Sequence, residues 1–271
     1  MTALATHSGS TAADTGIGAE LVVEDVVKTY RRSGGTPFNA LDHVSMRIDP
    51  GQFVCIVGPS GCGKSTLLQL VTGLGRPTSG TITCDGEPIK APGPERGLVF
   101  QKDSVFPWMR VIDNVAYGLK IRGVKKQERL AIAENYLDEV GLAHVAKAWP
   151  KELSGGMLKR VAVATTFANA PKLLLMDEPF ASVDYVTRQK LHRTVLALWA
   201  EHRLTVMFVT HDVDEALTLA DRIIVIKAGE VADDRMVAAG RPRTVEHLAS
   251  PEMVEHKERL LHLLGIGDED H

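Results

Sequence analysis

The chain has 271 residues, of which 44% are apolar and 24% charged, and its 31 Lys and Arg residues nearly balance 34 Asp and Glu residues for a net charge of −3. This length is ample for a buried core, while the charge balance gives no electrostatic sign of binding to nucleic acid or to an anionic membrane surface. The apolar runs fall far short of the ~20 residues that span a bilayer, and an odd number of cysteines, three in a long chain, favours a reducing compartment over a disulfide framework, so the cytosol is the default.

Residues 1–19 are rich in Ala, Ser, Thr and Gly and have little to bury, which predicts a disordered leader. The first basic residue is Lys28, so this leader lacks the positive region of a secretory signal. Short apolar runs then predict strands at 20–28, 44–48, 53–57, 81–84, 97–100, 172–176, 205–209 and 222–226. Helical patterns lie at 64–71, across 103–168, near 186–201 and 212–220, and at 252–264. This alternation indicates an α/β fold with a largely parallel sheet.

A glycine-rich loop follows the strand expected at 53–57. It reads Gly58, Pro59, Ser60, Gly61, Cys62, Gly63, Lys64 and Ser65. The order matches the phosphate-binding motif G-x-x-x-x-G-K-[ST], whose glycines let backbone N–H groups surround an anion while the next helix points its positive end at it. Lys64 would reach the β- and γ-phosphates, and the Ser65 hydroxyl would bind Mg²⁺. A chance match is disfavoured because the loop follows an apolar strand and opens a helix.

Two carboxylates, Asp177 and Glu178, end the apolar strand expected at 172–176. Ligands gather at the carboxyl ends of parallel strands, so both acids are expected to face the phosphates. Asp177 suits Mg²⁺, and Glu178 suits orienting or deprotonating an attacking water. The alternative is an ordinary apolar strand that meets an acidic helix start. His211 closes the strand at 205–209 and is expected beside these carboxylates, although a lone histidine is often a surface or satisfied core residue.

A serine and two glycines, Ser154, Gly155 and Gly156, stand before Met157 at an expected helix start. By itself this segment fits a capped turn with Ser154 as the N-cap. Between the phosphate loop and the acidic strand, however, it resembles the signature sequence of ATP-binding cassette (ABC) ATPases. Further marks of that family follow in the same order, namely Tyr30, Gln101 after a Val-Phe pair, the loop 181–184 ending in Asp184, and His211.

The resemblance covers about 20–234. It implies a P-loop NTPase (RecA-like) α/β core with an antiparallel β subdomain and an inserted helical subdomain at about 102–168, followed by a C-terminal tail, 235–271, with a short helix. ATP and Mg²⁺ are the implied ligands. The implied nucleotide-binding residues are Tyr30, which stacks on adenine, and Gly58, Pro59, Ser60, Gly61, Cys62, Gly63, Lys64, Ser65 and Thr66. The implied catalytic residues are Glu178, His211 and Gln101, and the implied metal ligands are Ser65, Gln101 and Asp177.

Family members work as head-to-tail pairs, so the resemblance implies a second copy of the chain as an ATP-dependent partner. The residues that would contact the partner's ATP are Ser154, Gly155, Gly156, Met157 and Asp184. A helix start with free N–H groups and no phosphate loop of its own fits that role.

A narrower likeness lies in 99–124, 153–164 and 173–184, with Met157 in place of the usual Gln and an Arg-Pro-Arg at 241–243. These segments are similar to importers of nitrate, sulfonates and taurine. The chain would then be a peripheral subunit on the cytoplasmic face of the inner (plasma) membrane, bound to a permease that receives solute from an extracytoplasmic binding protein. Phe106 and Trp108 would either line the permease groove or pack the helical subdomain. The loop 181–184 departs from the usual Gly-Ala-Leu-Asp or Ser-Ala-Leu-Asp, which leaves the substrate branch open.

The alternative is a soluble, non-transport ABC ATPase that acts on nucleic acid or the ribosome. Repair-type members separate the phosphate loop and the signature by a long coiled coil, whereas here Lys64 and Ser154 are 154 − 64 = 90 positions apart with no heptad run. Translation-type members carry two cassettes, and this chain has one set of motifs. The importer interpretation is therefore favoured, with no nucleic-acid partner.

Overall fold

The computed structural model describes residues 18–31, 35–101 and 105–266, apart from the side chain of Val245. Residues 1–17 of the predicted leader lie outside this range. Gly18 and Ala19, which the sequence assigned to the leader, are instead ordered. The Gly18 N–H donates to the Arg203 carbonyl, Ala19 is fully buried, and its carbonyl accepts a hydrogen bond from the Thr205 hydroxyl at 2.6 Å.

The central sheet of the described residues has the strand order β10-β9-β3-β8-β7-β6. Its strands are β3 (Phe53–Val57), β6 (Arg96–Val99), β7 (Leu173–Asp177), β8 (Thr205–Thr210), β9 (Arg222–Lys227) and β10 (Glu230–Met236). Every pair is parallel except β10 with β9. The sequence missed β10 because this edge strand alternates half-buried and exposed residues and contains no apolar run.

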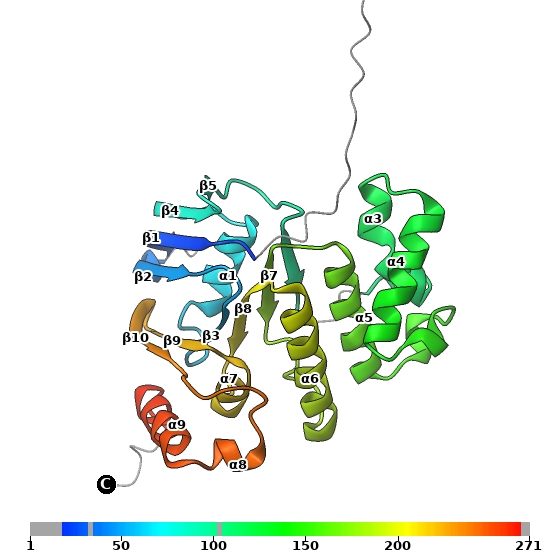
Figure 1. The fold of residues 1–271 in the computed structure, drawn as a ribbon. Helices are drawn as coiled ribbons and strands as arrows, with labels where there is room; N and C mark the ends of the chain where they lie inside the picture. Colours follow the sequence, from blue (N-terminus) through cyan, green and yellow to red (C-terminus); the bar gives the residue numbers. More distant parts are fainter. Residues whose placement is uncertain (1–17, 32–34, 102–104, 267–271) are drawn as a thin grey trace, which may run out of the picture.

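Both faces of this sheet are covered, which explains the continuous apolar run in β3. Phe53, Cys55 and Val57 point into one core, shared with α5 (Gly155–Ala168), α6 (Tyr185–His202) and α7 (Val213–Leu219). Val54 and Ile56 point into the other, shared with α1 (Lys64–Thr72) and a second sheet. In Figure 1 the second sheet lies at the upper left, whereas α6 and α7 lie lower in the view.

The second sheet is antiparallel, with the order β2-β1-β4-β5. Its strands are β1 (Leu21–Tyr30), β2 (Phe38–Ile48), β4 (Ser79–Cys84) and β5 (Glu87–Pro88). Its buried residues join the α1 core. This sheet is the antiparallel β subdomain that the family resemblance implies.

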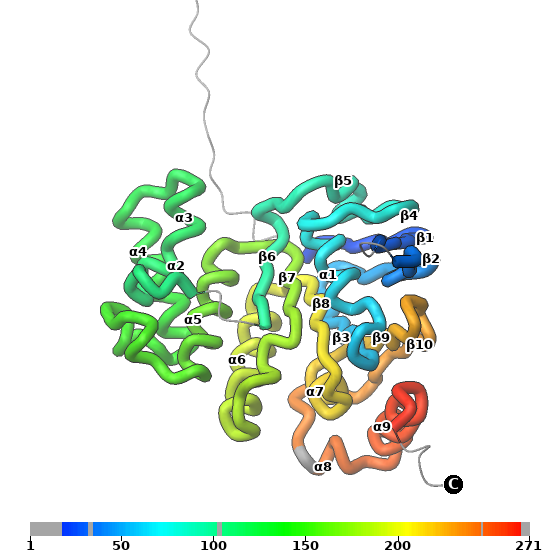
Figure 2. Tube along the Cα trace, turned by 180° about the vertical axis from the view of Figure 1, so that it is seen from behind, coloured from blue at the N-terminus to red at the C-terminus, as the bar shows by residue number. Residues whose placement is uncertain are grey.

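The helical subdomain lies between β6 and β7 in sequence and to one side of the sheets in space (Figures 1 and 2). It contains α2 (Val111–Val115), α3 (Tyr117–Ile121), α4 (Lys126–Glu139), short 3₁₀ turns at Ala143–Val145 and Pro150–Glu152, and α5. The expected apolar face of 130–140 is confirmed, since Ala133 and Leu137 are fully buried.

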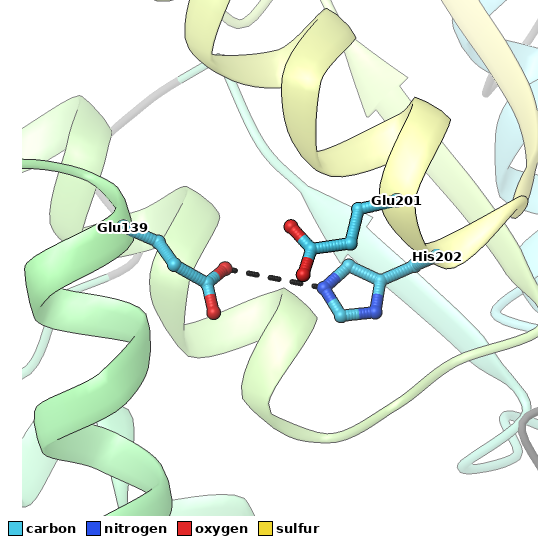
Figure 3. A group of neighbouring side chains, drawn as sticks. All are labelled: Glu139, Glu201 and His202. Carbon is cyan, nitrogen blue, oxygen red and sulfur yellow. Dashed lines mark ion pairs between the residues drawn. The ribbon is translucent and has the colours of Figure 1, made fainter.

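The helical subdomain meets the core where the ends of α4 and α6 approach each other. Figure 3 shows Glu139 of α4 facing Glu201 and His202 of α6. The His202 Nε2 lies 3.9 Å from a Glu139 carboxylate oxygen, and the ring of Tyr136 packs on the imidazole. Partial burial and the nearby Glu201 charge raise the pKa of Glu139. This contact joins the two parts with a weak ion pair and aromatic packing.

The C-terminal segment folds back onto α7. After β10 the chain passes through α8 (Val245–Leu248) into α9 (Pro251–Leu263), whose Met253 and Leu260 are buried in the α6–α7 core. Arg243 lies between β10 and α8 and is itself buried, donating to four backbone carbonyls. The tail is thus packed against the core, and its helix matches the one expected at 252–264.

Candidate active site

Four adjacent parallel strands bring the candidate residues to one edge of the central sheet. The strands lie in the order β3-β8-β7-β6, and their carboxyl ends are level. Val57 pairs with Thr210, and Asp177 pairs with Val209. The segments that follow these strands therefore meet, and they carry the phosphate loop, His211, Glu178 and Gln101.

Glycine is required at two positions of the phosphate loop. Gly63 has φ +113°, and a Cβ there would lie 2.4 Å from the Ala40 carbonyl oxygen. A Cβ on Gly58 would lie 2.2 Å from the Ile226 carbonyl oxygen. Only glycine fits such close backbone approaches, so the loop curls tightly onto β9 and β2 before α1 begins.

The Lys64 ammonium lies inside this loop. It donates to the carbonyls of Gly58 and Pro59 at 2.7 and 2.9 Å, and the residue is only 5% exposed. Buried charges need partners, and here backbone carbonyls supply them. The loop therefore holds a positive charge beside the N-terminus of α1, in an arrangement suited to a polyphosphate.

Ser65 and Asp177 form an oxygen pair next to the loop. The Ser65 hydroxyl donates to a carboxylate oxygen of Asp177 at 3.2 Å. Burial raises the pKa of Asp177 above its usual value, an effect that the Ser65 hydrogen bond opposes. A hydroxyl and a carboxylate at this spacing are the ligand types that Mg²⁺ takes alongside phosphate oxygens.

Glu178 stands between His211 and Gln101. The His211 Nδ1 lies 3.1 Å from one Glu178 carboxylate oxygen, and the Gln101 amide donates to the same oxygen at 3.4 Å. The Glu178 backbone is left-handed (φ +42°), and its N–H donates to the Val209 carbonyl at 2.9 Å. Six other non-glycine residues in the described part of the chain also have positive φ, so the two side-chain contacts are what distinguish Glu178. The geometry fits a group that orients a water molecule at the strand ends.

A pocket of about 260 Å³ opens over the loop. It is lined by Tyr30, Phe38, Ala40, Ser60, Gly61, Gly63, Lys64, Ser65, Thr66 and Glu178. The Tyr30 ring stacks on Phe38 at 5.9 Å, and the Lys28 ammonium lies 5.1 Å from the Tyr30 ring centre. Sequence analysis missed Phe38, although an aromatic residue eight positions after Tyr30 was an available signal.

Some predicted residues lie elsewhere. The Cys62 side chain is buried in the α1 core, so only its backbone belongs to the loop. Ser154 is the N-cap of α5, where its hydroxyl accepts from the Met157 N–H at 3.3 Å. Asp184 is the exposed N-cap of α6, and the Thr187 hydrogen bonds lower its pKa. The segment 154–157 and Asp184 are not among the residues that line the pocket of their own chain.

A buried lysine on α5, the helix that begins at the signature segment 154–157, contacts Gln101. Lys159 of α5 donates through its ammonium to the Gln101 carbonyl. Sequence analysis missed this contact, because a lysine two positions after Met157 on a helix is expected to be solvated. Its burial fixes the segment that follows β6.

Comparisons with known proteins identify the family of this chain. The ABC transporter family model matches residues 41–181. The nitrate import ATP-binding protein NrtD of Synechocystis sp. is 43% identical over 83% of this chain and 88% of its own length. An uncharacterized ABC transporter ATP-binding protein of Methanocaldococcus jannaschii is 41% identical over 90% of this chain and 91% of its own. A dimeric structure of the ATP-binding cassette MJ0796, in a post-hydrolysis state bound to ADP and Pi, has a TM-score of 0.73 and 32% identity, covering 81% of this chain and all of that one.

The fold and the loop geometry define a P-loop NTPase. The chain belongs to the ABC transporter family and is an ATP-binding subunit similar to NrtD. It is an ATPase of the class that couples hydrolysis to transport. Within the residues that the structure describes, no helix is long and apolar enough to span a bilayer.

Proposed function

We propose that the chain energises the import of a small anionic solute, of the nitrate, sulfonate or taurine type, through a separate permease that receives the solute from an extracytoplasmic binding protein. The observation that carries this proposal is the likeness to NrtD over most of both chains. A bicarbonate transport ATP-binding protein, CmpC of Synechococcus elongatus, is also 45% identical over 77% of this chain, though over only 32% of its own length. Both names concern small inorganic anions. The subunit would lie peripherally on the cytoplasmic face of the membrane.

The site geometry supports a role for each residue toward ATP. The loop 58–66 and the Lys64 ammonium would bind the phosphates, and Tyr30 would stack on the adenine. Ser65, Asp177 and Gln101 are the residues to hold Mg²⁺, which when bound would neutralise charge on the phosphate oxygens. Glu178 would orient the attacking water, and His211, 3.1 Å from Glu178, would hold that carboxylate in place and contact the γ-phosphate.

A second copy of the chain would complete each site. Ser154, Gly155, Gly156, Met157 and Asp184 lie away from the pocket of their own chain. The Tyr185 and Val186 side chains next to Asp184 are large, apolar and mostly exposed. An exposed apolar pair beside polar caps suits a protein interface. The dimeric cassette structure to which this chain is similar supports the same assembly.

The permease would dock on the helical subdomain. A pocket of about 230 Å³ there is lined by Trp108, Met109, Arg110, Asp113, Ala116, Lys120, Arg129 and Trp149. Trp108 is 70% exposed, whereas Phe106 packs edge-on against Tyr117 at 4.9 Å. Of the two aromatic residues considered from sequence, Trp108 is therefore the one that we propose meets a permease helix.

Glu178→Gln tests the ATPase mechanism. This change keeps the size of the side chain and removes the charge, so ATP should still bind while hydrolysis falls by about 10²- to 10⁴-fold, the range of a general-base contribution. Light scattering should show a dimer that persists in ATP. Glu255→Gln, an exposed change on α9, is the matched control. Turnover at the parent rate would remove Glu178 from this role.

The transport assignment is tested by co-purification. Tagged Glu178→Gln protein, extracted in detergent from host membranes, should carry a polytopic permease. Recovery of a ribosomal or other soluble partner without a permease would instead favour the non-transport alternative. The permease's binding protein can then be titrated with nitrate, taurine and alkyl sulfonates.

A further inference from the structure

A chain of buried hydrogen bonds runs from α6 to the backbone beside His211. Glu215 of α7 is 6% exposed, and His192 of α6 is 2% exposed. One Glu215 carboxylate oxygen lies 2.8 Å from the His192 Nε2, and the other accepts from the Thr210 hydroxyl at 2.6 Å. The Thr210 hydroxyl oxygen in turn accepts from the Asp212 N–H at 3.0 Å.

The pattern fixes the direction of these bonds. The His192 Nδ1 is buried and has no hydrogen-bond partner among the described residues. An ionised Glu215 carboxylate can only accept hydrogen bonds, so the proton between the two side chains is on the His192 Nε2. His192 therefore donates to a Glu215 carboxylate that also accepts from Thr210. The carboxylate is the hub of the chain.

One end of this hydrogen-bond network bears on the catalytic edge. Thr210 and Asp212 flank His211 on either side, so the direction of the His211 side chain depends on their backbone. A second link runs parallel, since Arg188 of α6 donates to the Asp212 carboxylate at 2.8 Å. The His211 side chain is 58% exposed, so surrounding packing restrains it little. The buried network beneath it supplies the restraint.

We infer that His192 and Glu215 are positioning residues for His211, holding the turn after β8 so that the imidazole reaches Glu178. Neither lies among the residues that line the pocket, so they act through the backbone of Thr210 and Asp212. The inference rests on the role proposed above for His211. It adds α6, which begins at the exposed Asp184, to the elements that set the geometry of hydrolysis.

Steady-state ATP hydrolysis by the purified full chain with Mg²⁺ tests this assignment. His192→Gln keeps a donor toward Glu215 and should stay within about twofold of the parent kcat. His192→Leu alone would leave a buried carboxylate short of a partner, so the double variant His192→Leu/Glu215→Met, which removes both polar groups together, is the decisive one. We expect its kcat to fall about tenfold, a part of the 10²- to 10⁴-fold that an acid–base group supplies, with the KM for ATP within about twofold.

Two controls separate positioning from general damage. Thr218→Val removes a buried hydroxyl of α7 that bonds only to the Asp214 carbonyl among the hydrogen bonds of the described residues, and it should leave kcat unchanged. In a His211→Ala background the double variant should cause no further loss, because residues that act through one group are not additive. A parent-like kcat for the double variant, or the same tenfold loss in both backgrounds, would overturn the inference while leaving the role of His211 intact. If His211→Ala itself hydrolyses ATP at the parent rate, the roles of His211 and of its two positioning residues both fall.

Discussion

Replacing Arg243 should measure how much this buried side chain contributes to the stability of the packed C-terminal segment. Its guanidinium donates to the carbonyls of Leu217 and Ala220 at the end of α7 and to those of Val237 and Ala239 after β10, at 2.6 to 3.1 Å. Arg243→Met keeps the length of the side chain but leaves four buried carbonyls without a donor. Two of the five hydrogen bonds share the Ala239 carbonyl. At a net value of about 1 kcal/mol for each of the four carbonyls, the loss is about 4 kcal/mol.

Burial lowers the pKa of Arg243, so holding this charge in the folded state has a desolvation cost. The value of about 1 kcal/mol is already net of desolvation, so we expect Arg243→Met to lose about 4 kcal/mol. For a chain of this size the midpoint of thermal unfolding should fall by on the order of 8–16 °C. Arg243→Lys, with a single ammonium, should fall between the parent and Arg243→Met.

Thermal unfolding followed by circular dichroism provides the assay, with hydrogen exchange of 238–266 to locate the change. Arg259→Met is the matched control, since Arg259 is 64% exposed and its partner Asp233, which is mostly buried, keeps its other ion pair with Arg235. Exposed pairs contribute ~1 kcal/mol or less. If Arg243→Met unfolds within about 2 °C of the Arg259→Met control, the hydrogen bonds do not hold the tail and the reasoning fails.

Three further results are expected. Because burial raises the pKa of Asp177, the native state binds the proton of this carboxyl more tightly than the unfolded chain does, and its contribution to stability falls as pH rises from the unfolded pKa near 3.9 through the raised one. Asp177→Asn should therefore unfold at a higher temperature than the parent at pH 7.5, this difference in unfolding temperature should close at acidic pH, and Mg²⁺-dependent hydrolysis should be lost. An equal difference at pH 4 and pH 7.5 would contradict this. Gly63→Ala should abolish binding of a fluorescent ATP analogue, since its Cβ would lie 2.4 Å from the Ala40 carbonyl oxygen, while Gly86→Ala, which has open space, should not. Cys62 is buried, with its sulfur 3.9 Å from the Lys64 ammonium, so an alkylating reagent reaches it only when the loop opens. The modified protein should not hydrolyse ATP, and bound ATP, by holding the loop closed, should slow the modification; equal rates with and without ATP would count against this.

The phosphate loop and the acidic pair could be predicted because their chemistry is local. Gly58 to Ser65 are consecutive residues, and Asp177 with Glu178 ends a strand whose apolar run is readable by itself. His211 lies beside Glu178 because β7 pairs with β8, in which Asp177 pairs with Val209, 209 − 177 = 32 positions away. The phosphate loop joins them because β3 pairs with β8, in which Val57 pairs with Thr210, 210 − 57 = 153 positions away. Sequence analysis expected that neighbourhood from the place of His211 at a strand end and from the family resemblance, and the strand order itself could not be derived from local sequence.

Sequence analysis missed residues whose contacts depend on their being buried in the fold. Lys159 and His192 read as polar positions on helices, and nothing in the local sequence shows that each is enclosed by another element. The strand β10 was missed because an edge strand with one neighbour needs no apolar run. Ala19 was assigned to the leader because a small residue carries almost no hydrophobic signal, yet its backbone pairs with Lys172 and Thr205.

The backbone contacts of Gly18 and Ala19 determine from which side of the molecule a group attached ahead of Gly18 would start. Arg203 and Lys172, whose carbonyls bind Gly18 and Ala19, precede β8 and β7 at their amino ends, on the edge of the sheet opposite to His211 and Glu178. A fluorophore, surface tether or purification tag joined ahead of Gly18 therefore starts from the far side of the molecule. Single-molecule or immobilised-protein experiments can use that end as a handle while nucleotide exchanges freely at the other edge.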